Sequence, residues 1–289
     1  MQETTEIKTM ESLVNRMLEV SADSPVYRKI AAYVEKEYMR LIFMTAEELA
    51  GELSISQGSV SKFCITLGYK GYADFLRNLQ RLVGKKITAP ERFYYTSQNE
   101  HHIDDVIEKE IANLHLLKAI TDSQEYTALV DALASYREVY LLSARMSATL
   151  LPYMKYLFDK LRDRVYMVTP DMGEWEYLQL KKEKEEIFVV GLGLPRYPRV
   201  LVDKLKVLRE EGFSIGIITD SRFSPLCKYG NINIFLPTTV SSIFDLYSTP
   251  MAFLNLLVTD VSKKIPQVKE RLDRIERQDI QNKVFYNKK

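Results

Sequence analysis

Three short stretches in the second half of the chain carry side chains that could bind a small anion. Each stretch follows an apolar run, and the seven candidate side chains are Ser143, Arg145, Ser147, Arg196, Arg199, Thr219 and Ser221. Guanidinium groups grip phosphate or carboxylate through paired hydrogen bonds, and hydroxyls can add further donors. We therefore expect an anion site here; the alternative is that the arginines face solvent or a second subunit.

A second group of polar residues, nearer the N-terminus, has the chemistry to contact DNA. Its members are small, polar or basic: Thr45, Ser56, Gln57, Gly58, Ser59, Ser61, Lys62, Tyr69 and Lys70. Small side chains let a helix approach the major groove closely, and Gln57 can make paired hydrogen bonds to adenine. Lys62 and Lys70 could reach phosphates.

The elements that must position this group are two short helices. Thr45 and Glu48 have the spacing of a capping box, which predicts a helix starting after Thr45. Residues 53–55 form a short connection, Ser56 can cap a second helix over residues 57–67, and Gly68 can end it. Two short helices joined by a tight turn are typical of a helix-turn-helix, whose second helix lies in the major groove.

An excess of basic residues in and after the predicted second helix supports this interpretation, although the chain as a whole is nearly neutral. The whole chain of 289 residues has 40 basic and 39 acidic residues, a formal net charge of +1. Between residues 56 and 86 there is one acid, Asp74, against six bases, Lys62, Lys70, Arg77, Arg81, Lys85 and Lys86. This local excess is what a DNA-binding surface needs. The alternative is a structural three-helix bundle with a solvated basic face.

The second half of the chain alternates short apolar runs with helical patterns. The runs cover residues 139–142, 165–168, 187–190, 215–218 and 232–236, and helices are expected up to residue 161 and over 200–211 and 244–263. This alternation predicts a mostly parallel, five-stranded sheet flanked by helices. A linker is expected at residues 85–90, a connecting helix at 103–120 and a charged surface helix in 268–289.

Three stretches of the first half resemble the helix-turn-helix of the RpiR (MurR/RpiR) family of transcription regulators. They read Thr-Ala-Glu-Glu-Leu-Ala at 45–50, Ser-Val-Ser-Lys-Phe-Cys at 59–64 and Leu-Gly-Tyr-Lys-Gly-Tyr-Ala-Asp-Phe at 67–75. The resemblance covers about residues 1–265. It implies an all-α N-terminal domain followed by a sugar isomerase (SIS) domain that holds a phosphosugar at loops after the strand ends.

The SIS-like loops depart from the family pattern. Where the family has Gly-x-Gly-x-Ser, residues 143–147 keep Ser147 but replace both glycines, and the loop at 191–199 lacks the family's hydroxyls. The stretches 218–221, 224–226 and 242–247 match. The resemblance therefore implies an anion that need not be a sugar phosphate. Gly191-x-Gly193 also hints at a dinucleotide site, but Arg196 occupies the third glycine position and argues against it.

Other classes of function find little support. Cys64 and Cys227 are expected to be buried free thiols rather than a disulfide or a metal site. The three histidines, at positions 101, 102 and 115, form no catalytic set, so we expect neither an enzyme, a cofactor nor a metal. No apolar stretch is long enough to span a membrane and no signal peptide is visible, which favours the cytoplasm.

The sequence thus predicts a DNA-binding transcription regulator controlled by a small anionic effector. The expected domains are residues 1–85 (helix-turn-helix), 86–120 (linker and connecting helix), 121–265 (SIS-like sensing and dimerisation domain) and 266–289 (charged tail). A homodimer or homotetramer would read a palindromic operator in double-stranded DNA, and the effector would shift the relative orientation of its DNA-binding units. Two alternatives stay open: a degenerate SIS domain that only dimerises, and an active sugar-phosphate isomerase.

Overall fold

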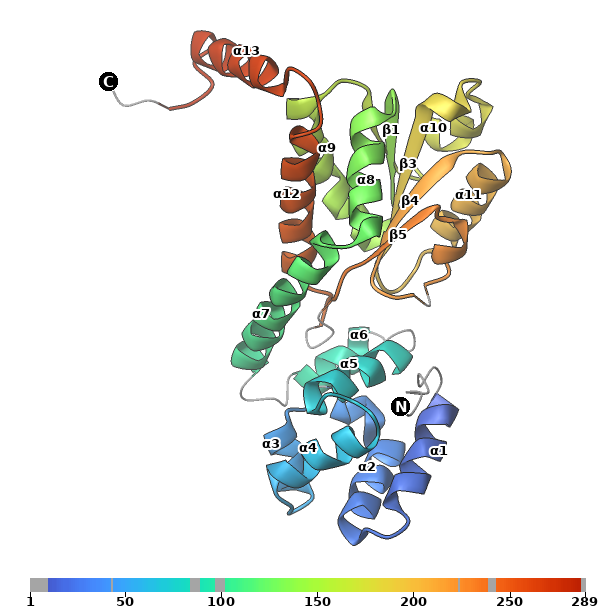
Figure 1. Ribbon diagram of the computed structural model, residues 1–289, viewed down its shortest axis with the longest axis vertical. Helices are drawn as coiled ribbons and strands as arrows, with labels where there is room; N and C mark the ends of the chain where they lie inside the picture. Colours follow the sequence, from blue (N-terminus) through green and yellow to red (C-terminus); the bar gives the residue numbers. More distant parts are fainter. Residues whose placement is uncertain are drawn as a thin grey trace. The chain divides into compact units, whose positions relative to one another are not determined.

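The structure is a computed structural model that describes residues 10–42, 44–83, 89–96, 102–222, 224–238 and 243–286 (Figure 1). The chain divides into two compact units. The first contains residues 1–109 together with 239–246, and the second contains residues 110–238 and 247–289. The first unit is therefore built from two separate segments of the chain.

Among the described residues of the first unit, every regular element is a helix. Its helices are α1 (Met10–Ser21), α2 (Pro25–Leu41), α3 (Ala46–Glu52), α4 (Gln57–Thr66), α5 (Tyr72–Val83), α6 (Ala89–Thr96) and the first turns of α7 (His102–Thr121). Helices α1 to α5 share one apolar core, whose largest fully buried side chains include Phe63 and Phe75. This confirms the expected helical N-terminal region.

Helix α5 begins at Tyr72, directly after Gly71, whose positive φ (154°) is a backbone conformation that favours glycine. One boundary in this unit differs from the sequence prediction. The linker expected at 85–90 overlaps α6, which starts at Ala89 and has Pro90 in its first turn, where proline is tolerated. Residues 85–88 lie outside the described part of the chain.

The second unit is an α/β fold around a five-stranded, fully parallel sheet. Its strands are β1 (Glu138–Leu142), β2 (Val165–Val168), β3 (Ile187–Leu192), β4 (Ser214–Thr219) and β5 (Ile232–Phe235), in the order β2-β1-β3-β4-β5. The α-helices of this unit, besides the end of α7, are α8 (Gln124–Ser135), α9 (Leu150–Leu161), α10 (Gly173–Tyr177), α11 (Arg199–Glu210), α12 (Ser248–Ser262) and α13 (Val268–Gln281). Short 3₁₀ turns are η1 (Arg145–Thr149), η2 (Leu178–Leu180), η3 (Lys184–Glu186) and η4 (Cys227–Tyr229).

Helices cover both faces of this sheet, as the continuous apolar strands predict (Figure 1). Alternate residues of each strand point to opposite faces, so Leu141 packs into the core beneath α8, α9 and α12, whereas Leu142 packs into the core beneath α10 and α11. The sheet is thus buried between two helical layers, and its functional groups must lie at the strand ends.

Of the last two helices, α12 differs from the sequence prediction and α13 agrees with it. Helix α12 begins at Ser248 rather than at residue 244. Helix α13 confirms the expected charged surface helix and has no buried residue.

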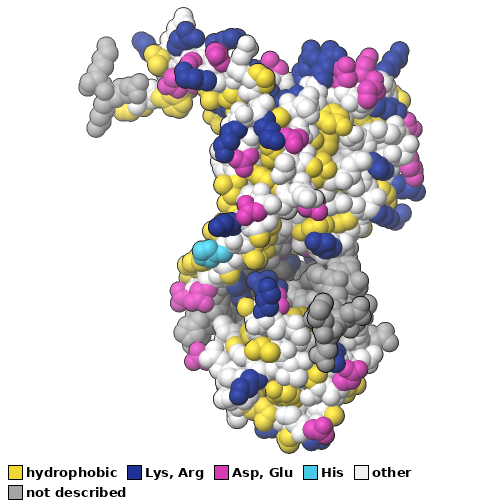
Figure 2. Space-filling model, in the orientation of Figure 1, with side chains coloured by type: hydrophobic (Ala, Val, Ile, Leu, Met, Phe, Trp, Pro, Cys, Tyr) yellow, Lys and Arg dark blue, Asp and Glu magenta, His cyan; other side chains and the backbone are white. Residues whose placement is uncertain are grey.

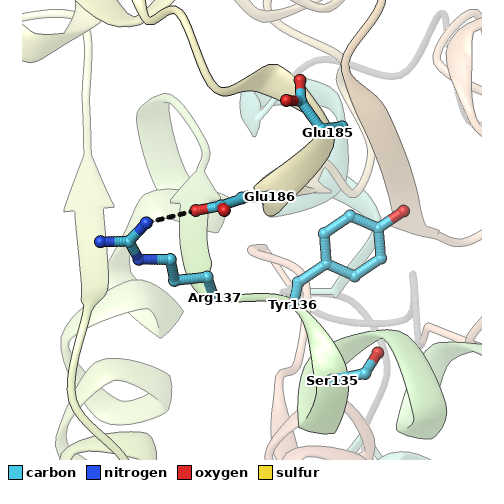
Figure 3. Close-up of a pocket in the computed structure, with 5 residues that line it drawn as sticks. All are labelled: Ser135, Tyr136, Arg137, Glu185 and Glu186. Atoms are coloured by element: carbon cyan, nitrogen blue, oxygen red, sulfur yellow. Dashed lines mark hydrogen bonds and ion pairs between the residues drawn. The ribbon is translucent and has the colours of Figure 1, made fainter.

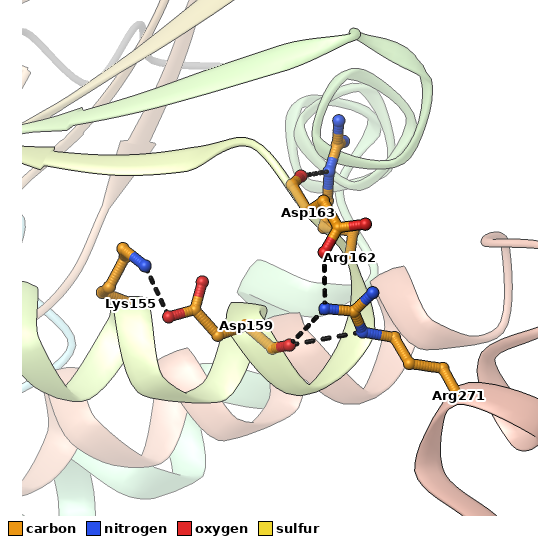
Figure 4. A network of polar contacts seen from close by, with 5 residues as sticks. All are labelled: Lys155, Asp159, Arg162, Asp163 and Arg271. Atoms are coloured by element: carbon orange, nitrogen blue, oxygen red, sulfur yellow. Dashed lines mark hydrogen bonds and ion pairs between the residues drawn. The ribbon is translucent and has the colours of Figure 1, made fainter. Parts of the chain in front are cut away.

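A polar network fastens α13 to α9 (Figure 4). The Arg271 guanidinium donates to the Asp159 carbonyl oxygen (2.9 Å) and pairs with the Asp163 carboxylate (2.8 Å). This bonding holds the pKa of Asp163 below its usual range. Arg162, beside it, donates to the carbonyl oxygen of Leu133 (2.6 Å) near the end of α8.

Candidate functional site

Helices α3 and α4 form the helix-turn-helix that the sequence predicts. The capping box is complete: the Glu48 N–H donates to Thr45 Oγ1 (3.1 Å), and the Thr45 N–H donates to Glu48 Oε2 (2.6 Å). Ser56 caps α4 by accepting from the Ser59 N–H (3.2 Å). Val60, Phe63 and Cys64 anchor α4 in the core, so its opposite face is held outward.

The outward face of α4 is polar, small and basic at its start. Gln57, Gly58 and Lys62 are exposed, and Ser61 is half-buried. A Cβ at Gly58 would meet only Ser56 Oγ, at 3.8 Å, so the helix backbone is open to an approaching surface there. Ile65 extends the same face with 57% of its surface exposed. Sequence reasoning missed Ile65, although its position four residues after Ser61 places it on this face.

The other predicted DNA-binding residues have local structural roles in this unit. Thr45 closes the capping box, and the hydroxyls of Ser56 and Ser59 bond each other at 2.8 Å. The Tyr69 hydroxyl donates to Asn78 Oδ1 (3.0 Å), and the Lys70 N–H donates to Asp74 Oδ2 (3.0 Å), which leaves the Lys70 side chain exposed. Of the basic residues counted between 56 and 86, Lys62, Lys70 and Arg77 are exposed; Lys85 and Lys86 lie outside the described residues.

The predicted effector residues lie on segments that leave the carboxyl end of the sheet. The strand order reverses between β1 and β3, which are neighbours in space but separated in sequence by β2. In open parallel sheets ligands bind at such a switch point, because the two connections leave in opposite directions and open a crevice. The segment after β1 carries Ser143 to Ser147, and the segment after β3 carries Arg196 and Arg199.

Three of the predicted hydroxyls tie these segments to one another. Ser143 Oγ donates to the Leu192 carbonyl oxygen (2.7 Å), and Thr219 Oγ1 donates to the Gly193 carbonyl oxygen (2.7 Å). Ser147 Oγ accepts from the Leu194 N–H (3.1 Å) and lies 3.4 Å from the Tyr247 hydroxyl. All three are buried, as is Ser221. The structure therefore brings the hydroxyls together and commits the protons of Ser143 and Thr219 to backbone carbonyls.

The three predicted arginines lie on the solvent side of this edge. Arg145, Arg196 and Arg199 are all exposed, and Arg199 Nε lies 3.4 Å from Asp203 Oδ2 one turn later in α11. The side chain of Arg199 is 94% exposed. The arginine side chains are thus accessible to an anion from solvent. No contact holds them next to the buried hydroxyls within the described residues.

Sequence reasoning missed a carboxylate and a phenol at this edge. Asp220 follows β4, and its Oδ1 accepts a hydrogen bond from the Tyr197 hydroxyl (2.6 Å). Burial raises the pKa of Tyr197, and the neighbouring Asp220 charge adds to this effect. Thr219 Oγ1 also lies 3.3 Å from Asp220 Oδ1. A carboxylate at Asp220 disfavours an anion next to it.

Packing explains the two glycines at the end of β3, Gly191 within the strand and Gly193 directly after it. A Cβ at Gly193 would come within 2.4 Å of Leu226 Cδ1, and one at Gly191 within 2.9 Å of Ile217 Cδ1. These glycines let the leucine and isoleucine side chains approach the backbone. This accounts for the Gly-x-Gly pattern without a phosphate.

Residues just before and at the start of α12 make polar contacts within each of the two units. Within the first unit, Asp245 pairs with Arg92 of α6 at 2.6 Å, and both side chains are only 6% exposed. Two residues later, within the second unit, Tyr247 reaches Ser147. The Glu110 carboxylate of α7 then accepts from the Thr249 hydroxyl (3.1 Å) at the start of α12.

A pocket of about 410 Å³ lies at the opposite, amino end of the sheet (Figure 3). It is lined by Ser135, Tyr136, Arg137, Glu185 and Glu186. The Arg137 and Glu186 side chains point toward each other and pair at 2.6 Å, so the strongest charges of this pocket satisfy one another. It lies away from the predicted effector residues.

Within the described residues, no group of three or more histidine, cysteine, aspartate or glutamate side chains could hold a metal ion. Among the described helices none is both long and apolar enough to cross a membrane. Cys64 is buried as expected, but Cys227 is half-buried, because η4 lies at the surface and its Sγ contacts the Ser221 carbonyl oxygen (3.4 Å).

Two family models match the chain. Residues 11–86 match the helix-turn-helix domain of the rpiR family, and residues 132–260 match the SIS domain. A curated relative from Caldanaerobacter subterraneus subsp. tengcongensis, described as an uncharacterized HTH-type transcriptional regulator, is 23% identical over 249 residues, which cover 83% of this chain and 85% of the relative. The matches confirm the expected pairing of domains.

Solved structures share this fold at low sequence identity. The sugar isomerase domain of an RpiR transcription factor from Sphaerobacter thermophilus superposes with a TM-score of 0.57 at 20% identity, covering 62% of this chain and 99% of that one. The Vibrio vulnificus NanR protein, complexed with ManNAc-6P, has a TM-score of 0.54 at 15% identity, covering 93% and 98%. Both likenesses support the architecture of the second unit.

Proposed function

Since the chain is an RpiR-family regulator that joins a helix-turn-helix domain to a SIS domain, we propose that it binds an operator through α4 and responds to a small anionic effector at the SIS crevice. The observation that carries the proposal is the exposed start of α4, where Gln57, Gly58 and Lys62 face outward from a capped, well-anchored helix. The proposed setting is the cytoplasm, where a regulator meets its DNA.

The contact that we propose for each of these side chains on DNA follows from its chemistry. Gln57 reads a base edge in the major groove, because its amide can donate and accept at adenine. Lys62 contacts phosphate, and Ile65 offers an apolar surface to a thymine methyl group. Lys70 and Arg77 extend the phosphate contacts beyond α4.

The test begins with selection of bound duplexes from a random pool, followed by affinity measurements with the full-length chain. Gln57→Ala is expected to relax the sequence preference at one position. Lys62→Ala is expected to weaken all duplexes alike. The matched control is Lys206→Ala, an exposed lysine of α11 in the other unit, which should change neither. Unchanged affinity and preference in both α4 variants would refute the assignment of α4.

We propose that the effector lies between Ser147 and the arginines after β1 and β3. Ser147 is buried and its hydroxyl lies 3.4 Å from that of the half-buried Tyr247, whereas Arg145 and Arg196 are exposed. A sugar phosphate suits this order, because its hydroxyls could bond inside and its phosphate could pair with guanidinium groups outside. That the similar NanR protein forms a complex with ManNAc-6P supports this choice of class.

The effector test is a thermal-shift screen of the purified chain against sugar phosphates, including N-acetylmannosamine 6-phosphate, and against sugar acids. A ligand at about 100 times its dissociation constant stabilises the folded state by roughly 2.7 kcal/mol, which shifts the melting temperature measurably. Arg196→Ala with Arg199→Ala should abolish the shift. The control pair Arg274→Ala with Arg277→Ala, on α13, should keep it. A full shift in the first double variant would overturn the site.

A second candidate is a SIS domain that only holds subunits together. The observation favouring it is that the hydroxyl protons of Ser143 and Thr219 are used by the backbone within the fold. No stabilisation by any compound in the screen, combined with intact DNA binding, would favour this candidate over an effector-controlled regulator. The isomerase alternative predicts turnover of a ketose or aldose phosphate, which an activity assay on the same panel detects.

A further inference from the structure

The pocket at the amino end of the sheet takes no part in the proposed operator and effector contacts. Its volume is about 410 Å³, which suits a small organic molecule, and its wall consists of the five residues drawn in Figure 3. All five belong to the second unit, where α8 leads into β1 and η3 leads into β3. The pocket therefore lies within one compact body.

One carboxylate of this pocket, that of Glu185, is available to a ligand. Glu186 is paired with Arg137 at 2.6 Å, whereas Glu185 is exposed and has no hydrogen-bond or ion-pair partner among the described residues. Figure 3 shows the Glu185 side chain turned away from the Arg137–Glu186 pair. One basic and two acidic side chains leave the wall with a formal charge of −1, which favours a cation over an anion.

Arg137 reports the sign of the electrostatic potential at this end of the sheet. Its hydrogen bond to Glu186 and the charge of Glu186 raise its pKa, and Glu138 and Glu183 act in the same direction. A raised pKa of a base means that its surroundings favour positive charge. On the face that Figure 2 shows, acidic and basic side chains are interspersed over the end of the second unit where α8 finishes. The preference for a cation therefore belongs to the pocket rather than to a large acidic surface.

The ring of Tyr136 gives the pocket an aromatic wall. The Tyr136 hydroxyl donates to Ser214 Oγ (2.9 Å), and the ring packs against that of Phe188 with 5.2 Å between centroids, so the side chain is fixed in place. An aromatic face attracts organic cations that lie within about 6 Å of its centre. A carboxylate near such a ring therefore suits an ammonium or guanidinium group that carries a carbon skeleton.

We propose that this pocket binds a small organic cation, whose ammonium or guanidinium group pairs with Glu185 while its carbon skeleton lies on the Tyr136 ring. Ser135 Oγ can accept a further hydrogen bond, because its own proton is donated to the Asp131 carbonyl oxygen (2.7 Å). A metal ion does not suit the pocket, because no three metal-ligating side chains come together among the described residues. The site lies at the opposite end of the strands from the proposed effector crevice, so neither proposal depends on the other.

Saturation-transfer NMR of the full-length chain tests the proposal with two probes of equal length, butylamine and the uncharged 1-butanol. One exposed ion pair and one aromatic contact give a weak complex, so butylamine should bind with a dissociation constant of about 1 mM. Glu185→Gln should weaken this binding about fivefold. Arg137→Gln releases the Glu186 carboxylate and should strengthen it about threefold. The matched control is Glu174→Gln on α10, another exposed glutamate without a partner among the described residues, which should change nothing.

Tyr136→Phe separates the ring from its hydroxyl. Because the hydroxyl is already bonded to Ser214, this variant should keep the affinity for butylamine. Equal affinity of butylamine for the wild type and for Glu185→Gln would overturn the proposal, as would equal binding of butylamine and 1-butanol. An equal loss in Glu174→Gln would also refute it, because it would reveal general attraction to acidic side chains. No DNA or effector is used, so failure here is distinguishable from failure of the proposed function.

Discussion

Replacing Ser143 by alanine tests whether the hydroxyls of the crevice are structural ties. Ser143 is fully buried, and its hydroxyl donates to the Leu192 carbonyl oxygen at 2.7 Å. Ser143→Ala removes this donor and leaves the buried carbonyl with fewer bonds, which costs about 1–3 kcal/mol of unfolding free energy. The expected result is a lower midpoint of urea unfolding with an unchanged slope.

Ser135→Ala provides a control with the same chemistry. Ser135 Oγ also donates to a carbonyl oxygen at 2.7 Å, that of Asp131, but the residue is exposed. Water replaces the lost bond there, so the change in stability should stay within about 0.5 kcal/mol. The single tryptophan, Trp175, is buried in the same unit and reports its unfolding by fluorescence. Equal effects of the two substitutions would show that burial of the Ser143 bond has no energetic consequence.

Three further predictions follow from the same geometry. Gly193→Ala should destabilise the second unit by about 1–3 kcal/mol, because the new Cβ would lie 2.4 Å from Leu226 Cδ1. The double variant with Leu226→Ala should lose less unfolding free energy than the sum of the losses in the two single variants. Strictly additive losses in urea unfolding would contradict the clash. Lys62→Ala should reduce the slope of log affinity against log salt by about one, measured by anisotropy with a selected duplex, and an unaltered slope would exclude a phosphate contact. Burial raises the pKa of the Cys64 thiol to about 12, so this thiol should stay unreactive toward a disulfide reagent at pH 8 until the chain unfolds; fast labelling of Cys64 in the native chain would contradict its burial.

The helix-turn-helix could be predicted from the sequence because its determinants are local. Thr45, Glu48 and Ser56 act on backbone groups within three residues, so their spacing alone identifies the caps. The parallel sheet was predictable for a similar reason, since each strand is a continuous apolar run between turns.

The crevice was harder to predict because its bonds join distant residues. Ser143 and Thr219 were candidates for ligand contacts, yet each donates to a segment 49 or 26 positions away. No local pattern shows which way such a hydroxyl turns. Asp220 escaped notice for the same reason, because its partner Tyr197 belongs to a different strand connection. The roles predicted for the arginines stay a prediction.

The Arg92–Asp245 pair also has a consequence for the order in which the chain is made. Asp245 is synthesised after all five strands, yet its carboxylate pairs with the buried Arg92 of the first unit. All other residues of that unit, apart from its short second segment, precede residue 110. A nascent or truncated chain ending before residue 245 therefore lacks this carboxylate. The first unit therefore gains this buried ion pair only once the ribosome has passed the segments that form the sheet.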